Sequence, residues 1–455
     1  MSDPHALSRR RFLKTSTAVV AGTCITSVQA QPAKTGIRVL HPMGRVPLSF
    51  IIDDSTCLVN MGHFCMPQFA AAWPERETYR QRWQDWPREI PDAFVREFGE
   101  WCAAHGVKGK YSIVPYPACV GWLDRELPGW SKRQLEDSLK LVRELMVPNW
   151  DMHPEMITHT RVIDLKTGRP MAEANSATME NSYPQQDVSV DYLASYLAYA
   201  LKILKNCDLP CEGITTPGGF GNRVKDKLPI AVHQAVRDVY GTDLPHYFKY
   251  IANGTESTRP KLEYTDSQRS ADRLTMNVLA GTGDWFGGWE GTVPSQGHRY
   301  ANDDATAGRM VELIQRGEPA VMLCHWPGMY CNGDKSGFRD FQRVVIALAK
   351  RFSQSTIWMK PSEIGRYEAA RQLTSLTMNN DHSIGVDAPY GCTNFTIELA
   401  HAGPDKILLH TESETTNIVQ MPTIRGSNQY SVANNMTRIC FDLPRGPSKL
   451  VLQAA

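Results

Sequence analysis

Two adjacent carboxylates, Asp53 and Asp54, follow directly on the apolar run of residues 46–52. The run is short and bounded by polar or turn residues, a pattern typical of a buried strand in a parallel sheet. In α/β barrels and open α/β sheets, the loops at the carboxyl ends of the strands converge on one cleft, where the chemistry takes place. Both carboxylates can reach such a cleft in different roles. The alternative interpretation is a turn or helix cap that ends the strand.

A second group of polar residues, Asp151, His153 and His159, lies near the carboxyl end of another predicted strand. Two histidines this close suit a divalent metal, because neutral imidazole is its commonest nitrogen ligand. His153 and His159 are six residues apart, so a bulged or looped segment must bring them together. Asp151 and His153 could instead share one strand face. Two separate surface or capping histidines remain the alternative.

Three further clusters fall at predicted strand ends. Residues 215–219 read Thr-Thr-Pro-Gly-Gly, a tight turn in which backbone amides lie open. Asp284 stands among the glycines and tryptophans of residues 283–289, which could also be a turn with packed aromatic rings. His325 follows the apolar run 320–324 and is a candidate acid or base, although a lone histidine after a strand is more often a buried core residue.

These residues need a scaffold, and the hydrophobic periodicity predicts one of alternating strands and helices. We expect strands at residues 46–52, 109–115, 147–153, 213–217, 250–253, 276–280, 320–326 and 356–360, and helices at residues 91–105, 131–146, 190–207, 224–240, 303–316 and 338–352. Ser131 is the expected cap of its helix, with Gln134 at the capping-box position. Repeated strand–helix units imply a parallel sheet with right-handed crossovers. A closed or nearly closed (β/α) barrel of seven or eight strands fits better than an open sheet.

The last part of the chain has a different sequence pattern. Short strands are expected at residues 394–399, 406–410, 417–421 and 436–442, separated by Gly, Asn and Pro and without a convincing helix. The predicted organisation is therefore a signal peptide at 1–30, a (β/α) barrel at 31–372 and a small β-sandwich-like domain at 373–455. Between the first strand and helix, the aromatic-rich segment 55–90 is either a substrate wall or a hydrophobic cover of the barrel rim.

The amino terminus has the pattern of an export signal. Residues 8–14 (SRRRFLK) form a twin-arginine signature, followed by a mild apolar run and a small-residue cleavage pattern that ends at Ala30. The apolar run is too short and too rich in Ser, Thr and Gly for a stable membrane span. We expect a soluble periplasmic or secreted bacterial protein that meets the Tat translocase during export. Such substrates cross the membrane folded, often with a cofactor already bound.

The net charge and the cysteine spacing argue against two classes of function. The net charge of +1 and the absence of a basic stripe make a nucleic acid an unexpected partner. Of the eleven cysteines, ten would remain after cleavage, and the pairs Cys57/Cys65, Cys207/Cys211 and Cys392/Cys440 are conceivable disulfides that spacing cannot assign. The chain has no Cys-x-x-Cys repeat, so no structural zinc ribbon is expected.

The order of these motifs resembles the polysaccharide deacetylase (NodB-homology) family of carbohydrate esterases over residues 40–365. The resemblance implies a distorted (β/α)7-type barrel that removes acyl groups from a carbohydrate or glycan with a bound divalent metal, Zn²⁺ or alternatively Co²⁺ or Mn²⁺. It also implies that Asp53 is the catalytic base, His325 the general acid, and Asp284 part of the catalytic set.

The same resemblance makes Asp54, His153 and His159 the metal ligands. A tetrahedral oxyanion would be stabilised by the metal and a backbone amide near Gly218, and the residues expected to contact substrate are Thr215, Pro217, Gly218 and Trp285. The pattern departs from the family in three ways: the two histidines are six residues apart instead of four, Thr215 stands where the family has Arg, and Gly281 replaces an Asp.

Two other functions fit the same scaffold. A glycoside hydrolase would use paired carboxylates, Asp53 or Asp54 with Asp284 or Glu290, across an aromatic-lined groove. A non-catalytic carbohydrate-binding protein would use the tryptophan-rich segment and the β domain.

Overall fold

The fold is a mixed α/β structure built around a barrel-like arrangement of parallel strands. The computed structural model describes residues 36–401 and 403–453. One sheet has the order β11 (Ala320–His325), β2 (Val46–Asp53), β3 (Gly109–Ser112), β4 (Trp150–His153), with β12 (Thr356–Trp358) also paired to β2. The second sheet has the order β7 (Gly213–Thr215), β8 (His246–Ile251), β10 (Leu274–Ala280), β9 (Lys261–Tyr264). All pairs are parallel except β9–β10.

The two sheets meet at two seams. Isolated parallel bridges join Glu155 to Thr215, after β4, and Asp284 to Leu323, between the turn after β10 and β11. A ring of strands linked in this way is barrel-like, as expected from the alternating pattern. The more specific (β/α)7 barrel stays a prediction, because only single bridges span the seams.

The apolar run of β2 forms the centre of the core. Phe50 stacks on Phe341 at a centroid distance of 4.5 Å and packs with the helices, whereas Ile51 faces the opposite cluster with Val321 and Phe248. Alternate residues of β2 are therefore buried on both faces, which is why the segment is almost continuously apolar. The strand carries Asp53 to its carboxyl end.

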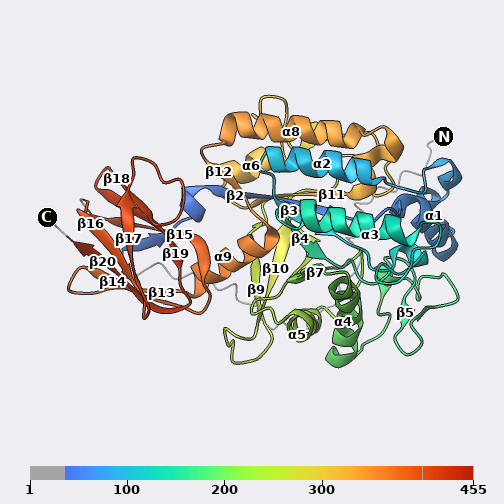
Figure 1. The fold of residues 1–455 in the computed structure, drawn as a ribbon, viewed down its shortest axis with the longest axis horizontal. Coiled ribbons are helices and arrows are strands. Elements are labelled where there is room, and N and C mark those ends of the chain that lie inside the picture. Colours follow the sequence, from blue (N-terminus) through green and yellow to red (C-terminus); the bar gives the residue numbers. More distant parts are fainter. Residues whose placement is uncertain (1–35, 402, 454–455) are drawn as a thin grey trace, which may run out of the picture. The chain divides into compact units, whose positions relative to one another are not determined.

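Helices cover the outside of the strands. In Figure 1, α2 (Asp92–Ala104), α3 (Lys132–Leu141) and α8 (Ser336–Phe352) lie on one side, and α4 (Val190–Asn206) and α5 (Leu228–Tyr240) lie on the other. α6 (Arg309–Gln315) is shorter than predicted. The predicted capping box of α3 is present: Ser131 Oγ accepts from the backbone N–H of Gln134, and Gln134 Oε1 accepts from the N–H of Ser131.

Nine strands form the carboxy-terminal sheet, in the order β1-β15-β19-β18-β17-β16-β20-β14-β13. Their bounds are β1 (Ile37–Val39), β13 (Ser375–Met378), β14 (Ser383–Ala388), β15 (Cys392–Ala400), β16 (Lys406–His410), β17 (Thr415–Gln420), β18 (Gln429–Ala433), β19 (Met436–Leu443) and β20 (Gly446–Gln453). β1 pairs antiparallel with β15, so a segment that precedes the barrel completes this sheet. Residues 35–455 form one compact unit. The domain boundary at residue 372 stays a prediction.

Several elements differ from the expectations. The segment 55–90 contains α1 (Met61–Ala72), and α9 (Pro361–Leu373) follows the last barrel strand. β8 begins at His246, four residues before the predicted strand, because the polar His246 and Lys249 obscure its apolar pattern. The ten cysteines within the described residues are all free. The predicted export signal lies outside the described residues, and among those described no helix has the length and apolar character needed to cross a membrane.

Candidate active site

Asp54, Glu155 and His159 form a buried cluster at the carboxyl ends of β2 and β4. One ligand atom from each residue lies within 4.8 Å of the other two. His159 Nε2 is 2.8 Å from Asp54 Oδ1 and 3.5 Å from Glu155 Oε1. Two carboxylates and one imidazole are a donor set that suits zinc and similar divalent ions. His159 Nδ1 is buried without a hydrogen-bond partner, so the protein does not satisfy every polar atom of this cluster.

The backbone holds this cluster in an uncommon conformation. Asp54 has φ of 59° and His159 has φ of 62°, both in the left-handed region. Such strain in non-glycine residues is concentrated at functional sites. Glu155 contributes a second contact, since its Oε2 accepts a 2.7 Å hydrogen bond from the backbone N–H of Asp54. This bond joins the ends of β2 and β4 and directs the other oxygen of Glu155 toward His159.

A buried carboxylate, Glu180, fixes the loop that carries His159. Its oxygens accept hydrogen bonds from the backbone N–H groups of Ile157, Thr158 and His159, at 3.2, 3.0 and 2.6 Å, and from the hydroxyl of Tyr196 at 2.5 Å. Burial raises the pKa of Glu180 to about 7, against the lowering effect of these donors. Glu180 is therefore a positioning residue for the loop.

Asp53 is paired with a buried lysine that no motif in the sequence marks. Lys110, on β3, is fully buried and donates to Asp53 Oδ1, to the carbonyl of Ile52 at 3.1 Å and to Ser112 Oγ at 2.7 Å. Burial raises the pKa of Asp53, and the charge of Lys110 opposes this rise. The lysine supplies the counter-charge that a buried carboxylate needs.

His325 and Asp284 form a second ionised pair beside Asp53. His325 is the register partner of Asp53 on the neighbouring strand, so the two side chains leave the same region of the sheet. Its Nδ1–H donates to Asp284 Oδ2 at 2.7 Å. Burial alone would lower the pKa of His325, but the hydrogen bond to Asp284 and the charges of Asp54, Asp284 and Asp53 raise it to about 10. With a side chain 26% exposed, the imidazolium can reach a bound molecule.

The turn that holds Asp284 is anchored by Tyr300. The Tyr300 hydroxyl accepts from the N–H of Trp285 at 2.8 Å and donates to the carbonyl of Leu323 at 2.7 Å. Trp285 packs against the Tyr300 ring at 4.9 Å and beneath the guanidinium of Arg299 at 4.2 Å. The predicted contact residue Trp285 therefore lies beside the His325–Asp284 pair.

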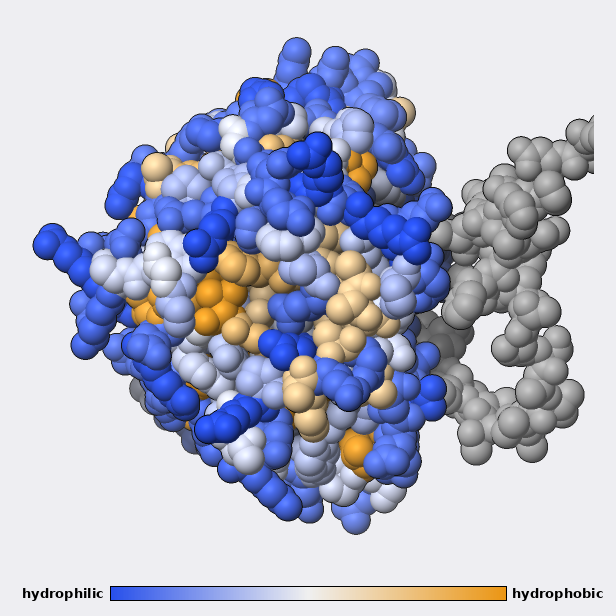
Figure 2. Space-filling model, turned by 90° about the vertical axis from the view of Figure 1, so that its right-hand side faces the viewer, coloured by the Kyte–Doolittle hydropathy of each residue, from blue (hydrophilic) through white to orange (hydrophobic). Residues whose placement is uncertain are grey.

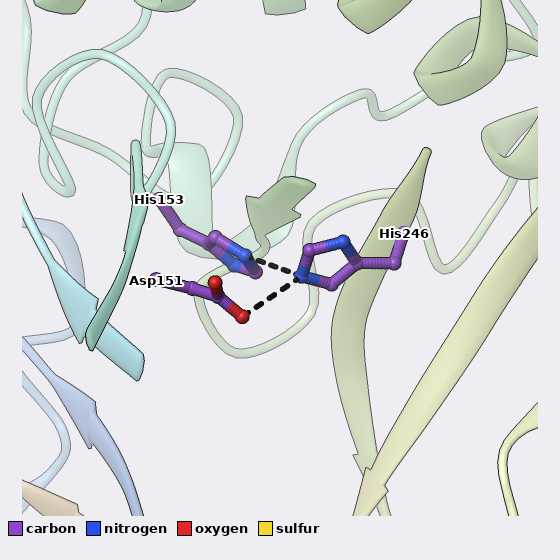
Figure 3. Close-up of side chains that lie close together, drawn as sticks. All are labelled: Asp151, His153 and His246. Atoms are coloured by element: carbon purple, nitrogen blue, oxygen red, sulfur yellow. Dashed lines mark hydrogen bonds and ion pairs between the residues drawn. The ribbon is translucent and has the colours of Figure 1, made fainter. Parts of the chain in front are cut away.

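The structure places His153 elsewhere. Instead of joining Asp54 and His159, it lies with Asp151 and His246 in a separate buried group (Figure 3). The structure therefore brings Asp54 and His159 together with Glu155 and not with the predicted His153, and the role of these residues as metal ligands stays a prediction. The reason is geometric: His153 belongs to the extended strand β4, whereas the non-helical loop after β4 turns back and brings His159 to Glu155 and Asp54.

The predicted turn at residues 215–219 does not offer all its amides. Thr215 is fully buried and its hydroxyl contacts His153 Nδ1 at 3.2 Å. The N–H of Gly219 donates to the carbonyl of Asn181 at 2.8 Å, so it is not free for an oxyanion. Gly218 has φ of 44° in the turn after Pro217. Contacts of Pro217 and Gly218 with a substrate stay predictions.

Aromatic side chains from the segment 55–90 border the cluster. The Phe69 ring lies 6.1 Å from His159, 5.3 Å from Trp289 and 5.4 Å from Tyr79. Figure 2 shows the side of the molecule on which α1 lies, with apolar residues gathered near the middle of the face and polar residues between them. Glu290, a carboxylate considered for glycoside hydrolysis, is on this rim and accepts from Gln81 at 3.2 Å.

The comparisons with known proteins give no family for this chain. No family model and no curated protein matches. Similar solved structures include a glycoside hydrolase family 30 subfamily 8 xylanase, Xyn30A, from Clostridium acetobutylicum (9% identity, 91% of this chain and 96% of that chain, TM-score 0.28). Another is the endo-beta1,6-glucanase BT3312 (9% identity, 92% of this chain and 92% of that chain, TM-score 0.29). A third is the catalytic domain of a GH30 xylanase C from Talaromyces cellulolyticus (8% identity, 91% of this chain and 98% of that chain, TM-score 0.27).

These findings correct the family resemblance inferred from the motifs. No polysaccharide deacetylase model matches, and the similar solved structures are glycoside hydrolases, so membership of the deacetylase family is contradicted. The TM-scores, all below 0.3, are too low to assign this chain to the glycoside hydrolases instead.

Proposed function

We propose that this protein is a hydrolase that uses metal-assisted acid–base catalysis on a carbohydrate. The observation that carries the proposal is the convergence of Asp54, Glu155 and His159 within 4.8 Å, at the same strand ends as the pairs Asp53–Lys110 and His325–Asp284. A divalent ion held by the first three residues would act as a Lewis acid and lower the pKa of water. Zn²⁺ suits these donors, with Co²⁺ and Mn²⁺ as alternatives.

The two remaining pairs supply the proton transfers. Lys110 favours the ionised form of Asp53, which can then take a proton from the attacking water. Asp284 keeps His325 protonated, so its Nε2–H can be given to the departing group. The proposed base and acid come from register-paired positions on adjacent strands, so both side chains can reach the same bound group.

The substrate class rests on the aromatic border. Phe69, Tyr79 and Trp289 pack together next to His159, and aromatic faces of this kind suit the apolar faces of sugar rings. The metal-assisted arrangement fits an acyl bond on a carbohydrate, whose carbonyl oxygen the ion can polarise.

A glycoside hydrolase is the second candidate. Burial raises the pKa of Asp53, and a carboxyl group with a raised pKa is what a glycosidase needs as its general acid. In that mechanism one of the neighbouring carboxylates, Asp54 or Glu155, would act as base or nucleophile. With either function, we propose that the protein is exported by the twin-arginine route and is periplasmic or secreted.

A product assay distinguishes the candidates. The purified full chain, loaded in turn with Zn²⁺, Co²⁺ and Mn²⁺, would be incubated with acylated and unacylated glycans. Released carboxylic acid that disappears in Asp54→Asn and His159→Gln supports the first proposal. New reducing ends that persist after chelation support glycoside hydrolysis. Metal-independent binding of glycans without either product would mean that the protein is a binding protein.

A further inference from the structure

Asp151 and His153 on β4 point toward His246 on β8, inside the protein (Figure 3). His153 Nε2 and His246 Nε2 are 2.8 Å apart, and Asp151 Oδ2 is 3.7 Å from His246 Nε2. All three ligand atoms lie within 4.8 Å of one another, and the three residues are buried. The group shares no residue with the Asp54, Glu155 and His159 cluster.

These separations are close to the distance between two ligand atoms that bind the same metal ion. With metal–ligand distances of about 2.0–2.1 Å and tetrahedral angles, two ligand atoms of a zinc site lie roughly 3.3 Å apart. The observed values of 2.8 and 3.7 Å fall on either side of this figure. Small shifts of side chains would therefore bring the three atoms around one ion.

The outer atoms of His153 and Asp151 are held by hydrogen bonds, as second-shell contacts require. His153 Nδ1 lies 3.2 Å from Thr215 Oγ1, to which it can donate, and this leaves Nε2 with its lone pair directed at His246. Asp151 accepts from the backbone N–H of Ser362 at 2.7 Å and from its hydroxyl at 2.8 Å. Metal-ligating histidines and carboxylates are normally oriented by partners of this kind.

Charge favours a cation over a shared proton. The two facing imidazole nitrogens must be separated by a proton or a metal ion, and Asp151 brings a carboxylate to the same nitrogen of His246. The other ring nitrogen of His246, Nδ1, is buried without a partner; in the tautomer that carries the proton there, Nε2 keeps its lone pair for a ligand. Bound metal would supply interaction energy that the protein contacts lack.

The group lies where an ion would stabilise the contact between two strands. The ladder between β4 and β7 is reduced to the single bridge between Glu155 and Thr215, so this seam is the weak part of the ring. Gly213 stands at the seam, where a Cβ would lie 2.6 Å from His153 Nε2. A cavity of about 220 Å³, lined by Asp151, Glu212 and Ser362 among others, lies beside the Asp151 end of the group.

We propose that Asp151, His153 and His246 bind a second divalent cation of the zinc class, which ties β4 to β8 across the open seam. This ion is structural: it holds the strand from which the loop with Glu155 and His159 departs. The inference goes beyond the proposed hydrolytic function and does not depend on it.

The test is metal stoichiometry of the full chain and of matched variants. Protein stripped with a chelator and dialysed against Zn²⁺ would be assayed for bound metal and thermal stability, with circular dichroism to confirm folding. Asp54→Asn removes a ligand of the catalytic centre, and His246→Gln removes a ligand of the seam. His233→Gln is the control, because His233 is also buried but is not part of the group: among the described residues its ring contacts the Leu274 carbonyl and Arg237.

The expected result is two zinc equivalents in the wild type and in His233→Gln, and one in each of the other variants. The equivalent that remains in Asp54→Asn should raise Tm when zinc is added back, and it should disappear in the double variant. A folded Asp54→Asn variant that binds no zinc would refute the proposed seam site. The proposed catalytic centre would remain supported by zinc bound to the wild type. If His246→Gln fails to fold, the zinc content of the wild type and of Asp54→Asn still shows whether the seam site binds zinc.

Discussion

His325 donates from Nδ1 to Oδ2 of Asp284 over 2.7 Å, and this bond crosses the seam between β11 and the turn after β10. The bond and the nearby carboxylates raise the pKa of His325 from 6.5 to about 10 although burial acts in the opposite direction. The pair therefore keeps an imidazolium at neutral pH in the candidate active site.

Hydrolysis should fall as the pH rises through about 10, where His325 loses its proton. In Asp284→Asn the alkaline limb of the pH–rate profile should move to lower pH, by about 1–3 units, because an opposite charge is lost. Asp303→Asn is the control, since that carboxylate pairs with Arg343 and is 86% exposed. An unchanged alkaline limb in Asp284→Asn would contradict the assignment of His325 as the acid.

The same shift fixes the pH range in which the pair stabilises the fold. Because the pKa of His325 is raised in the folded protein, its stabilising contribution is complete below about pH 6.5 and is lost as the pH rises through about 10. Urea unfolding at pH 6 and pH 10 should show a smaller loss of stability with pH in His325→Gln than in the wild type.

Lys110→Met should cost about 3–5 kcal/mol of unfolding free energy, because it leaves the buried Asp53 without a counter-charge. The pKa of Asp53 should rise further, so the acidic limb of activity moves to higher pH. Lys108→Met is the matched control: its ion pair with Glu363 at 3.2 Å is about one-third exposed and should be worth about 0–1 kcal/mol. Equal losses in the two variants, measured by urea denaturation, would refute the special role of Lys110.

Glu180→Gln should weaken metal binding about 10–100-fold, because the loop that carries His159 loses an acceptor for its backbone N–H groups. Leaving such donors unpaired should also cost about 1–3 kcal/mol of stability. Glu89→Gln, which affects only the partner of the Trp130 indole, is the comparison. Reduced stability with unchanged zinc affinity would limit Glu180 to a structural role.

The sequence predicts those site residues whose signal is local. Asp53 and His325 each end an uninterrupted apolar run, and in parallel strands that position defines the cleft edge. The helix cap at Ser131 is equally local, since the capping box needs only residues three apart. For the same reason most barrel strands and helices were predictable.

The residues missed are those whose role arises from tertiary contacts. Lys110 lies in a strand with no motif, and only the pairing of β2 with β3 brings it to Asp53. Glu180 and His246 come from an irregular segment and from the start of a strand, far in sequence from the groups they contact. Glu155 is close to His159 in sequence, but the segment that joins them is a loop, so their spacing of four residues does not by itself predict the contact.

The most direct test of the account is zinc bound by Glu155→Gln. Glu155 is the ligand that the structure adds to the centre with Asp54 and His159, and Glu144→Gln, at an exposed carboxylate paired with Lys140, is the control. We predict that Glu155→Gln binds one zinc equivalent fewer than the wild type and loses hydrolysis, while Glu144→Gln matches the wild type. Full zinc content in a folded Glu155→Gln protein would contradict the proposed catalytic centre.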